Sequence, residues 1–419
     1  MAVQFVKRPG FPREQAASTP VAFDPTGLDA FGRLRTAAPH SIFDSKQLFD
    51  NQPLFYDDQE VSGSGTSSSH SSNRASTTLS VSSSTAGKRV RQTFQRFNYQ
   101  PGKSQLIYLT GRMVASGGGE GIVGEIGYGD NNNGIFWRYD EGINKLVIKS
   151  YVTGSVVETV VSQADWNRDP LTGSGSSGIT LDPAKVQIFF IDFEWLGVGI
   201  VRCGFIIDGE YILAHQFNHA NNITSVYMST PNLPIRYSIE NDGSGQASSL
   251  EHICSAVISE GGIDPHVSQF YASTSGTHVD ANVVGTIYAI IGIRLKSAHT
   301  GQQVEIKNLS ILGLYPHTTF EWLLILNPTI ASTFTYNGLT NSSIEYATGA
   351  TANTVTGGTV LTGGFVPSDG HSSGITLNLN NVISLGESIS GTKDTLVVCA
   401  RPLTANADIE AGITWQEYA

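Results

Sequence analysis

The sequence predicts an all-β protein: a jelly-roll-like antiparallel β-sandwich with an extended N-terminal arm and a smaller C-terminal β domain. Glycine makes up 45 of the 419 residues, and charged residues make up only 15% of the chain. Short runs of β-branched and aromatic residues alternate with turns rich in Gly, Ser, Asn and Thr, a pattern typical of sandwiches. Residues 88–315 show no helical period of ten residues or more, so we expect no long helix there.

The charge balance and the apolar content exclude several classes of protein. The formal net charge is −11, which argues against direct binding of nucleic acid over a broad surface. No stretch of 18 apolar residues occurs, so we expect no membrane-spanning helix. The first residues lack an apolar signal core, so we expect synthesis in a cytoplasm. We expect Cys203, Cys254 and Cys399 to be buried or half-buried free thiols, because they are far apart and odd in number.

Residues 1–61 are rich in proline but also in aromatic residues, which predicts an extended arm. Phe43, Phe49 and Phe55 recur every six residues, each preceded by an aliphatic residue. An extended chain places all three rings on one side, because six is a multiple of the strand period. We therefore predict that this arm anchors the chain in a neighbouring molecule. The alternative is an arm packed on its own domain.

Residues 62–87 are dominated by Ser, Gly and Thr, and we interpret them as a linker that is flexible in its first half, with a strand at Thr78–Val81 as the alternative for its second half. The main β-sandwich is predicted over residues 88–315. Its early strands are expected at the following runs, which are separated by turn residues: Gln105–Val114, Gly121–Tyr128, Gly134–Tyr139, Leu146–Tyr151 and Val156–Val161. Later strands are expected at Thr224–Ser229, Ile235–Glu240, Leu250–Glu260, Val284–Leu295 and Gln303–Leu314.

The segment between these two groups predicts a three-stranded meander. Val186–Trp195 is apolar on both faces, which indicates a central strand. Val198–Ile207 follows, and Asp208-Gly209 then separates it from Glu210–Leu213. A two-residue Asp-Gly connection is a strong hairpin signal, because both turn positions require a positive φ.

Residues 316–419 predict the smaller C-terminal β domain. Turns such as Asn337-Gly338 and Gly357-Gly358 punctuate its short apolar runs. The segment is rich in Thr and Asn and nearly free of Lys and Arg. Such polar surfaces suit contacts with glycans or with other subunits, and a plain solvated face is the alternative.

Two groups of titratable residues were weighed as reactive or metal sites. Asp192 and Glu194 share one strand face beside aromatic residues, as the two carboxylates of a glycosidase do. The favoured interpretation is that Asp192 pairs with Arg202 across the hairpin. His215 and His219 have the spacing H-x3-H, but on a strand they lie ~13 Å apart, too far to share a metal. No nucleophile motif and no phosphate loop occurs, so we expect neither an enzyme nor a cofactor or metal.

Two polar motifs have a structural interpretation beside a functional one. The run Asp130–Gly134 (DNNNG) offers oxygen ligands for a cation, but it lacks the bidentate acid and is better explained as a tight turn. Lys88, Arg89, Arg91 and Arg96 form a dense basic cluster. We interpret the cluster as a charged strand edge, with contact to an acidic neighbour as the alternative.

Four blocks of the sequence, in this order along the chain, carry a resemblance. The blocks are FGRLRTAAPHSIFDSKQLFD at Phe31–Asp50, RQTFQRFNYQPGKSQLIYLTG at Arg91–Gly111, DFEWLGVGIVRCGFIIDGE at Asp192–Glu210 and MSTPNLPIRYSIEN at Met228–Asn241. Together with the terminal Trp415-x-Glu417, they resemble structural proteins of tailed bacteriophages and some other large DNA viruses. Cys203 departs from the aromatic or aliphatic residue expected at its position.

The resemblance implies a non-enzymatic virion component, such as a capsid-associated, decoration or tail protein. Its partners would be other virion proteins and copies of itself, and it would be located in the virion after synthesis in the host cytoplasm. The alternative is a carbohydrate-binding module or host-recognition adhesin. For that alternative, the candidate ligand surface is Trp137, Tyr139 and Trp166 with the polar loop 165–183, and exposed aromatics clustered at one sandwich edge would support it.

Overall fold

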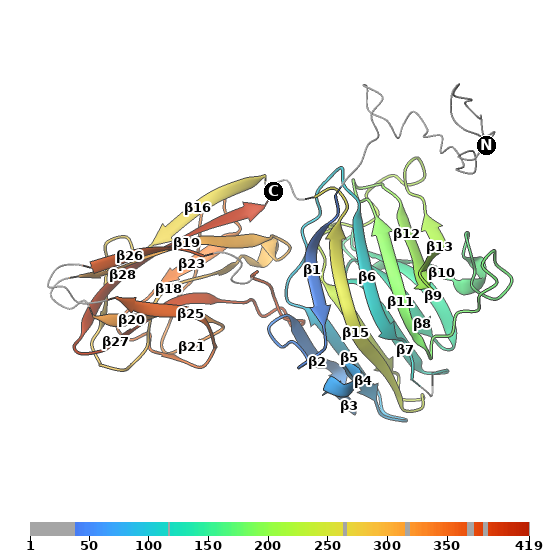
Figure 1. Ribbon diagram of the computed structural model, residues 1–419, viewed down its shortest axis with the longest axis horizontal. Coiled ribbons are helices and arrows are strands. Elements are labelled where there is room, and N and C mark those ends of the chain that lie inside the picture. The colour runs from blue at the N-terminus through green and yellow to red at the C-terminus, as the bar shows by residue number, and fades with distance from the viewer. Residues whose placement is uncertain are drawn as a thin grey trace, which may run out of the picture.

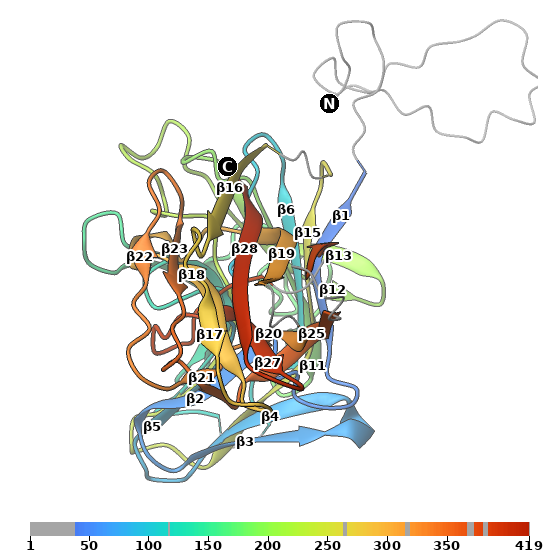
Figure 2. The ribbon, with the colours of Figure 1, turned by 90° about the vertical axis from the view of Figure 1, so that its left-hand side faces the viewer.

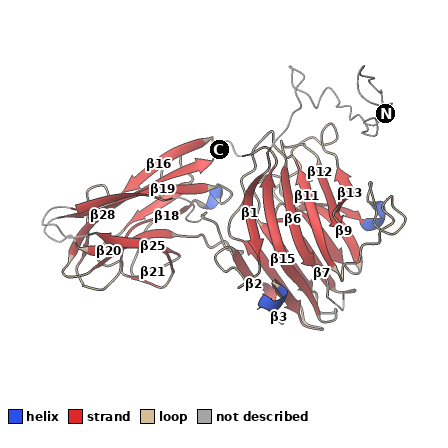
Figure 3. Ribbon diagram, in the orientation of Figure 1, coloured by secondary structure: helices blue, strands red, loops and turns tan. Residues whose placement is uncertain are grey.

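The computed structural model describes residues 38–115, 118–262, 266–314, 319–366, 373–379 and 384–418. These residues form two β-sandwiches that lie side by side (Figure 1). The described helical elements are single 3₁₀ turns, blue in Figure 3, at Ser72–Arg74, Gln163–Asp165 and Ser297–His299. No helix within the described residues has the length and apolar character needed to cross a membrane. The predicted all-β sandwich fold is therefore confirmed.

The first sandwich consists of an eight-stranded and a seven-stranded antiparallel sheet. The eight-stranded sheet has the order β13 (Glu210–Phe217), β12 (Val201–Ile207), β11 (Val186–Phe193), β6 (Gln105–Arg112), β15 (Ser248–Ser259), β4 (Ser76–Val81) and β3 (Thr66–Ser71), and β1 (His40–Lys46) also pairs with β15. The seven-stranded sheet has the order β10 (Val157–Ser162), β9 (Ile143–Ser150), β8 (Gly134–Asp140), β7 (Ile122–Gly129), β14 (Ile235–Asn241), β5 (Gly87–Thr93) and β2 (Tyr56–Gly63).

The predicted meander is confirmed. Strands β11, β12 and β13 pair in sequence order, and β11 lies between β12 and β6 inside the sheet. Asp208 and Gly209 adopt φ values of 55° and 85°, as a two-residue hairpin turn requires. Large aromatic side chains from both sheets then meet in the core: the Trp137 and Phe205 rings lie 5.0 Å apart, and Phe189 lies 5.4 Å from Phe205.

The second sandwich is built the same way from a five-stranded and a six-stranded sheet. The five-stranded sheet has the order β16 (Val267–Ser273), β28 (Ala407–Tyr418), β19 (Val304–Leu314) and β26 (Ser373–Asn378), and β17 (Val279–Ala281) also pairs with β28. The six-stranded sheet has the order β22 (Asn337–Gly338), β23 (Ile344–Thr348), β18 (Tyr288–Leu295), β27 (Leu396–Pro402), β20 (Phe320–Leu326) and β25 (Thr359–Val366). A two-stranded ribbon joins β21 (Thr329–Ile330) to β24 (Val355–Thr356). Figure 2 shows this sandwich from its own side, with the first sandwich behind it.

The predicted boundary between residues 315 and 316 is wrong. Strand β19, before that point, pairs along its whole length with β28 at the end of the chain. Likewise β18 pairs with β27, so both sheets of the second sandwich combine strands from either side of the boundary. The second sandwich therefore begins at β16, and the main block predicted over residues 88–315 is divided between the two sandwiches.

The predicted linker over residues 62–87 is also wrong. Strands β3 and β4 lie within it and pair with each other, and β4 pairs with β15 in the first sandwich. Leu79 and Val81 of β4 are buried in the core, while the Ser and Thr residues of β3 lie at the sheet edge. A strand needs only one apolar face, so a composition dominated by Ser and Thr did not exclude one.

Candidate functional site

The predicted arm does not present its three phenylalanines on one surface. Residues 1–37 of the arm lie outside the described residues, and residues 40–61 fold onto the first sandwich as β1 and β2. Phe43 is buried, with its ring 5.0 Å from that of Phe97, whereas Phe49 is 91% exposed. Phe55 is 45% exposed, with its ring 6.1 Å from that of Phe43. The three rings do not share one side because the chain turns after β1. Phe43 packs on its own domain, as the alternative predicted, whereas Phe49 and Phe55 remain exposed.

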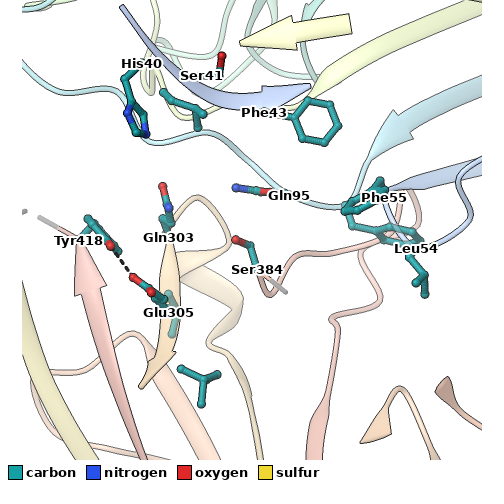
Figure 4. A pocket seen from close by; sticks show the side chains of 14 residues that line it. His40, Ser41, Phe43, Leu54, Phe55, Gln95, Gln303, Glu305, Ser384 and Tyr418 are labelled. Carbon is teal, nitrogen blue, oxygen red and sulfur yellow. Dashed lines mark hydrogen bonds between the residues drawn. The ribbon is translucent and has the colours of Figure 1, made fainter. Parts of the chain in front are cut away.

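Phe43 and Phe55 line a cleft of about 560 Å³ between the two sandwiches (Figure 4). The first sandwich contributes aromatic and aliphatic walls, and the second contributes polar groups from β19 and β28. Its lining residues are His40, Ser41, Ile42, Phe43, Leu54, Phe55, Phe94, Gln95, Gln303, Val304, Glu305, Ile306, Ser384 and Tyr418.

The carboxylate in this cleft is engaged within the chain. The Tyr418 hydroxyl donates a hydrogen bond of 2.6 Å to Glu305, as drawn in Figure 4, and the Lys307 ammonium lies 2.6 Å from the other oxygen. Burial raises the pKa of Glu305, but the bonds from Lys307 and Tyr418 outweigh it, so that the pKa lies below its usual value. Glu305 is thus an ionised structural group that holds β19 and the chain end.

Three polar contacts fix the two sandwiches on either side of the cleft. Arg96 of the first sandwich lies 3.0 Å from the Glu387 carboxylate, and the Glu387 amide donates to the Phe94 carbonyl. The Ile389 amide donates a 2.7 Å hydrogen bond to the Asp57 carboxylate. The cleft therefore lies at an interface where hydrogen bonds and an ion pair join the two sandwiches.

The aromatic ligand surface predicted from the sequence is wrong in its residues. Trp137 is fully buried, and Trp166 and Tyr139 are 4% and 8% exposed. Trp137 donates to Asn144 inside the core, and the Trp166 ring stacks 6.3 Å from Phe205. These side chains lie on the inner faces of their elements, so they pack the first sandwich and offer no surface to a ligand. The loop 165–183 closes over β13, where Asn167 bonds the backbone of Gln216.

One exposed aromatic residue, Tyr211, does lie at an edge of the first sandwich, beside the half-buried Tyr108 and the buried Phe190, but these are not the residues predicted. Tyr108 of β6 pairs directly with Phe190 of β11, and Ile206 of β12 pairs with Tyr211 of the edge strand β13. Tyr211 is 57% exposed, and Ile188 on the same face is 37% exposed. We call the group Tyr108, Ile188, Phe190, Ile206 and Tyr211 the aromatic platform. In Figure 1, no described element lies over these strands on the face turned to the viewer.

The platform is held in place by its own contacts. The Tyr211 ring stands edge-on to Phe190 at 5.3 Å, and the hydroxyls of Tyr211 and Tyr108 contact each other. Gly204 pairs with Phe190, and a Cβ on that glycine would lie 2.8 Å from the phenyl ring. The missing side chain therefore lets Phe190 lie close against the sheet and support Tyr211 from below.

The predicted pairing of Asp192 with Arg202 is confirmed at the border of the platform. The two residues are cross-strand partners, and their charged groups lie 3.1 Å apart. Burial raises the pKa of Asp192, and Arg202 offsets only part of this effect. Glu194 lies beyond the end of β11, where its carboxylate accepts from the Ile200 amide. Asp192, the carboxylate for which a glycosidase role was the less favoured interpretation, is thus held by an arginine.

The two histidines weighed as metal ligands serve the fold. His215 accepts a hydrogen bond from the Asn167 amide, and His219 donates to the Gly199 carbonyl while its ring stacks 4.2 Å from Tyr227. Burial lowers the pKa of both imidazoles. Within the described residues, no group of three or more His, Cys, Asp or Glu side chains is arranged to hold a metal.

The remaining polar motifs are also explained by structure. Asp130 caps the predicted tight turn by accepting from the amides of Asn132 and Asn133. The basic cluster is not at a sheet edge, because β5 lies between β14 and β2. Instead, its cations each face a carboxylate of this chain: Lys88 faces Glu240, Arg89 and Arg91 face Asp58, and Arg96 faces Asp130 and Glu387. The three cysteines are free thiols, as predicted.

No family model and no curated protein matches this chain. Solved structures give remote likenesses. An endo-1,3-β-glucanase from Streptomyces sioyaensis is 9% identical over 58% of this chain and 100% of its own, with a TM-score of 0.33. A legume lectin-like domain from Entamoeba histolytica is 10% identical over 53% and 98%, with a TM-score of 0.34. Lectin II from Ulex europaeus is 9% identical over 53% and 100%, with a TM-score of 0.33. At these values, the function has to be argued from the residues of this chain.

Proposed function

We propose that this protein is a non-enzymatic glycan-binding protein that holds a neutral polysaccharide on the aromatic platform of the first sandwich. The observation that carries the proposal is the exposed Tyr211 ring, set over Phe190 on an uncovered sheet face. Tyr211 lies on the edge strand β13, where exposed aromatics were expected for a carbohydrate-binding module, and Phe190 supports it from β11.

The chemistry of a pyranose ring matches this surface. A sugar presents C–H groups on its faces and hydroxyls around its rim, and an aromatic side chain offers an apolar face with a polar tip. Tyr211 and Tyr108 combine ring and hydroxyl, while Ile188 and Ile206 extend the apolar floor between them. The charged groups of Asp192 and Arg202 at the border supply an acceptor and donors for hydroxyls.

A hydrolytic role is less well supported than binding. A glycosidase needs two carboxyl groups free to act as acid and as nucleophile or base. Asp192 is paired with Arg202, and Glu194 accepts from a backbone amide. We therefore keep the proposal to binding without bond cleavage.

The experiment is affinity electrophoresis of the full chain in gels containing laminarin, mannan or galactomannan. Tyr211→Ala is expected to weaken retardation by at least about tenfold in Kd, because a central aromatic anchor contributes ~2 kcal/mol or more. The matched control is Tyr151→Ala, which removes a 40% exposed tyrosine away from the platform. Retardation that is absent in the wild type, or equal in Tyr211→Ala and the control, would contradict the proposal.

A second candidate function is assembly into a virion, which the resemblance to virion structural proteins implies. One observation favours it: the connection between β1 and β2 exposes Leu48, Phe49, Leu54 and Phe55, with Phe49 at 91%. Clustered exposed apolar side chains mark contact sites for other proteins. We propose other virion proteins or a second copy of this chain as the partner.

Sedimentation of the full chain and of Phe49→Glu tests this candidate. Self-association or particle incorporation by the wild type that is lost in Phe49→Glu is the expected result. Equal behaviour of the two chains would contradict an assembly role for this connection. Because Phe49 is almost fully exposed, the substitution leaves the core packing intact.

A further inference from the structure

We propose that the second sandwich carries its own sugar-binding groove on the outer face of its five-stranded sheet. The inference rests on the proposed function, because it gives the protein a second contact with the same class of ligand. The groove encloses about 310 Å³ across β16, β28, β19 and β26. The side chains proposed to contact the sugar are Tyr271, Ser310, Thr376 and Glu410, and Gly412 forms part of the floor of the groove.

The register of the sheet brings these residues together from strands far apart in the sequence. Ser310 of β19 pairs with Gly412 of β28 on one side and with Thr376 of β26 on the other. Glu410 lies two residues before Gly412 on β28, so its side chain projects from the same face. Three oxygen-bearing side chains therefore share one outer face at neighbouring positions.

Tyr271 forms the aromatic wall of the groove. The ring is 57% exposed, and it belongs to the edge strand β16. A Cβ on Gly412 would lie 2.4 Å from the Tyr271 hydroxyl, so the glycine is what allows the ring to lie over the sheet. Phe190 lies against Gly204 in the same way in the first sandwich. Each sandwich thus places one outward aromatic ring over a glycine on a sheet face.

The charge of the groove selects the chemical class of its ligand. Within the described part of the chain, no hydrogen bond or ion pair engages the Glu410 carboxylate. A half-buried carboxylate accepts hydrogen bonds from sugar hydroxyls, whereas a uronic acid would place a like charge beside it. No lysine or arginine lines the groove to offset that repulsion. The ligand we infer is a neutral polysaccharide segment.

Two sugar sites on one chain are expected to raise its affinity for a long polysaccharide. Once one sugar segment is held, the second site meets the same polymer at a high effective concentration. The avidity of a long chain then exceeds that of either site by roughly 10²–10⁴-fold. A short oligosaccharide that reaches only one site gains none of this.

The test compares four full-length proteins by affinity electrophoresis in laminarin, mannan and galactomannan: the wild type, Tyr211→Ala, Tyr271→Ala and the double variant. We expect Tyr271→Ala to weaken binding at least about tenfold, and the double variant to lose it. Glu410→Gln is expected to admit polygalacturonate, which the wild-type groove should exclude. The matched control is Phe365→Ala, a 67% exposed aromatic on the other sheet of the same sandwich.

The outcomes separate this inference from the proposed function. If Tyr271→Ala binds like Phe365→Ala while Tyr211→Ala is weakened, the groove is not a site and the platform stands. If Tyr271→Ala alone abolishes binding and Tyr211→Ala does not change it, the groove stands and the platform is wrong. A wild type that binds none of the three polysaccharides overturns both. Thermal unfolding midpoints within about 2 °C of wild type show that the variants are folded.

Discussion

The two sandwiches share an architecture but differ in what they bury. The first buries Arg91 and His252 between its sheets, and Glu125, Lys149 and Arg236 on the outer face of its seven-stranded sheet, each at most 9% exposed. The second is built mainly from Ile, Leu, Val and Ala, and its buried acids among the described residues are Asp394 and Glu417. The comparison shows that the same fold can be stabilised by buried, paired charges in one sandwich and by apolar packing in the other. We expect the first sandwich to be sensitive to charge and pH, and the second to depend on apolar packing.

The largest expected effect is the loss of a buried cation in the first sandwich. Arg91 is fully buried, bonds His252 and Gln47, and lies over the Tyr56 ring at 4.4 Å. Arg91→Ala leaves the buried acceptors of His252 and Gln47 without this donor and opens a cavity beside Tyr56, at an expected cost of about 3–5 kcal/mol in the free energy of unfolding, although Asp58 keeps its ion pair with Arg89. Hydrogen exchange should show that the backbone amides of residues 40–260 lose protection. Lys46→Ala, which breaks an exposed ion pair with Asp44, is the control and should cost under about 0.5 kcal/mol.

The next effect is acid sensitivity confined to the first sandwich. Burial, and next the charge of Arg91, lower the pKa of His252 well below its usual value, so the folded imidazole stays neutral. The unfolded imidazole binds a proton below pH ~6.5, so unfolding takes up a proton and stability falls as the pH drops. At pH 5.5 the loss is about 1.4 kcal/mol relative to neutral pH.

His252→Gln checks this expectation by denaturant unfolding between pH 7.5 and 5.5. The amide retains an acceptor for Arg91 but does not titrate, so the pH dependence should become shallower by the same amount. An unchanged slope would mean that His252 does not set it. His215 and His219, whose pKa values are also lowered by burial, supply the part of the slope that remains.

The smallest effect concerns the junction. Glu387 joins the sandwiches through Arg96, which retains Asp130 as a second partner. Glu387→Gln is therefore expected to cost only about 1 kcal/mol. Calorimetry should show the two sandwiches unfolding farther apart in temperature than in the wild type. A single unchanged transition would show that the Arg96–Glu387 ion pair does not couple them.

Local features of the fold could be predicted because they depend on neighbouring residues. The hairpin at Asp208-Gly209 follows from a backbone requirement that the two residues meet by themselves. The pairing of Asp192 with Arg202 follows from the register of the preceding hairpin, whose short connection runs from β11 to β12. In both cases, everything that decides the structure lies within about twenty residues of sequence.

Long-range features could not be predicted in the same way. The partner of β19 is β28, about a hundred residues away, and no composition change at residue 315 reveals it. The aromatic residues of the site show the same limit. Strand alternation assigns Phe189 and Phe190 to opposite faces of the sheet. Which of the two faces the core depends on the side on which the seven-stranded sheet packs, and that side is not encoded locally. The two apolar faces of Val186–Trp195 correctly indicated a central strand, but they did not reveal that Phe190 supports the exposed Tyr211.

The most direct test of the account is a crystal structure of the full chain with a neutral oligosaccharide. We predict a sugar ring stacked on Tyr211, with hydroxyls bonded to the Asp192 and Arg202 side chains. A sugar found instead in the cleft beside Phe55 and Glu305, with the platform empty, would contradict the central claim.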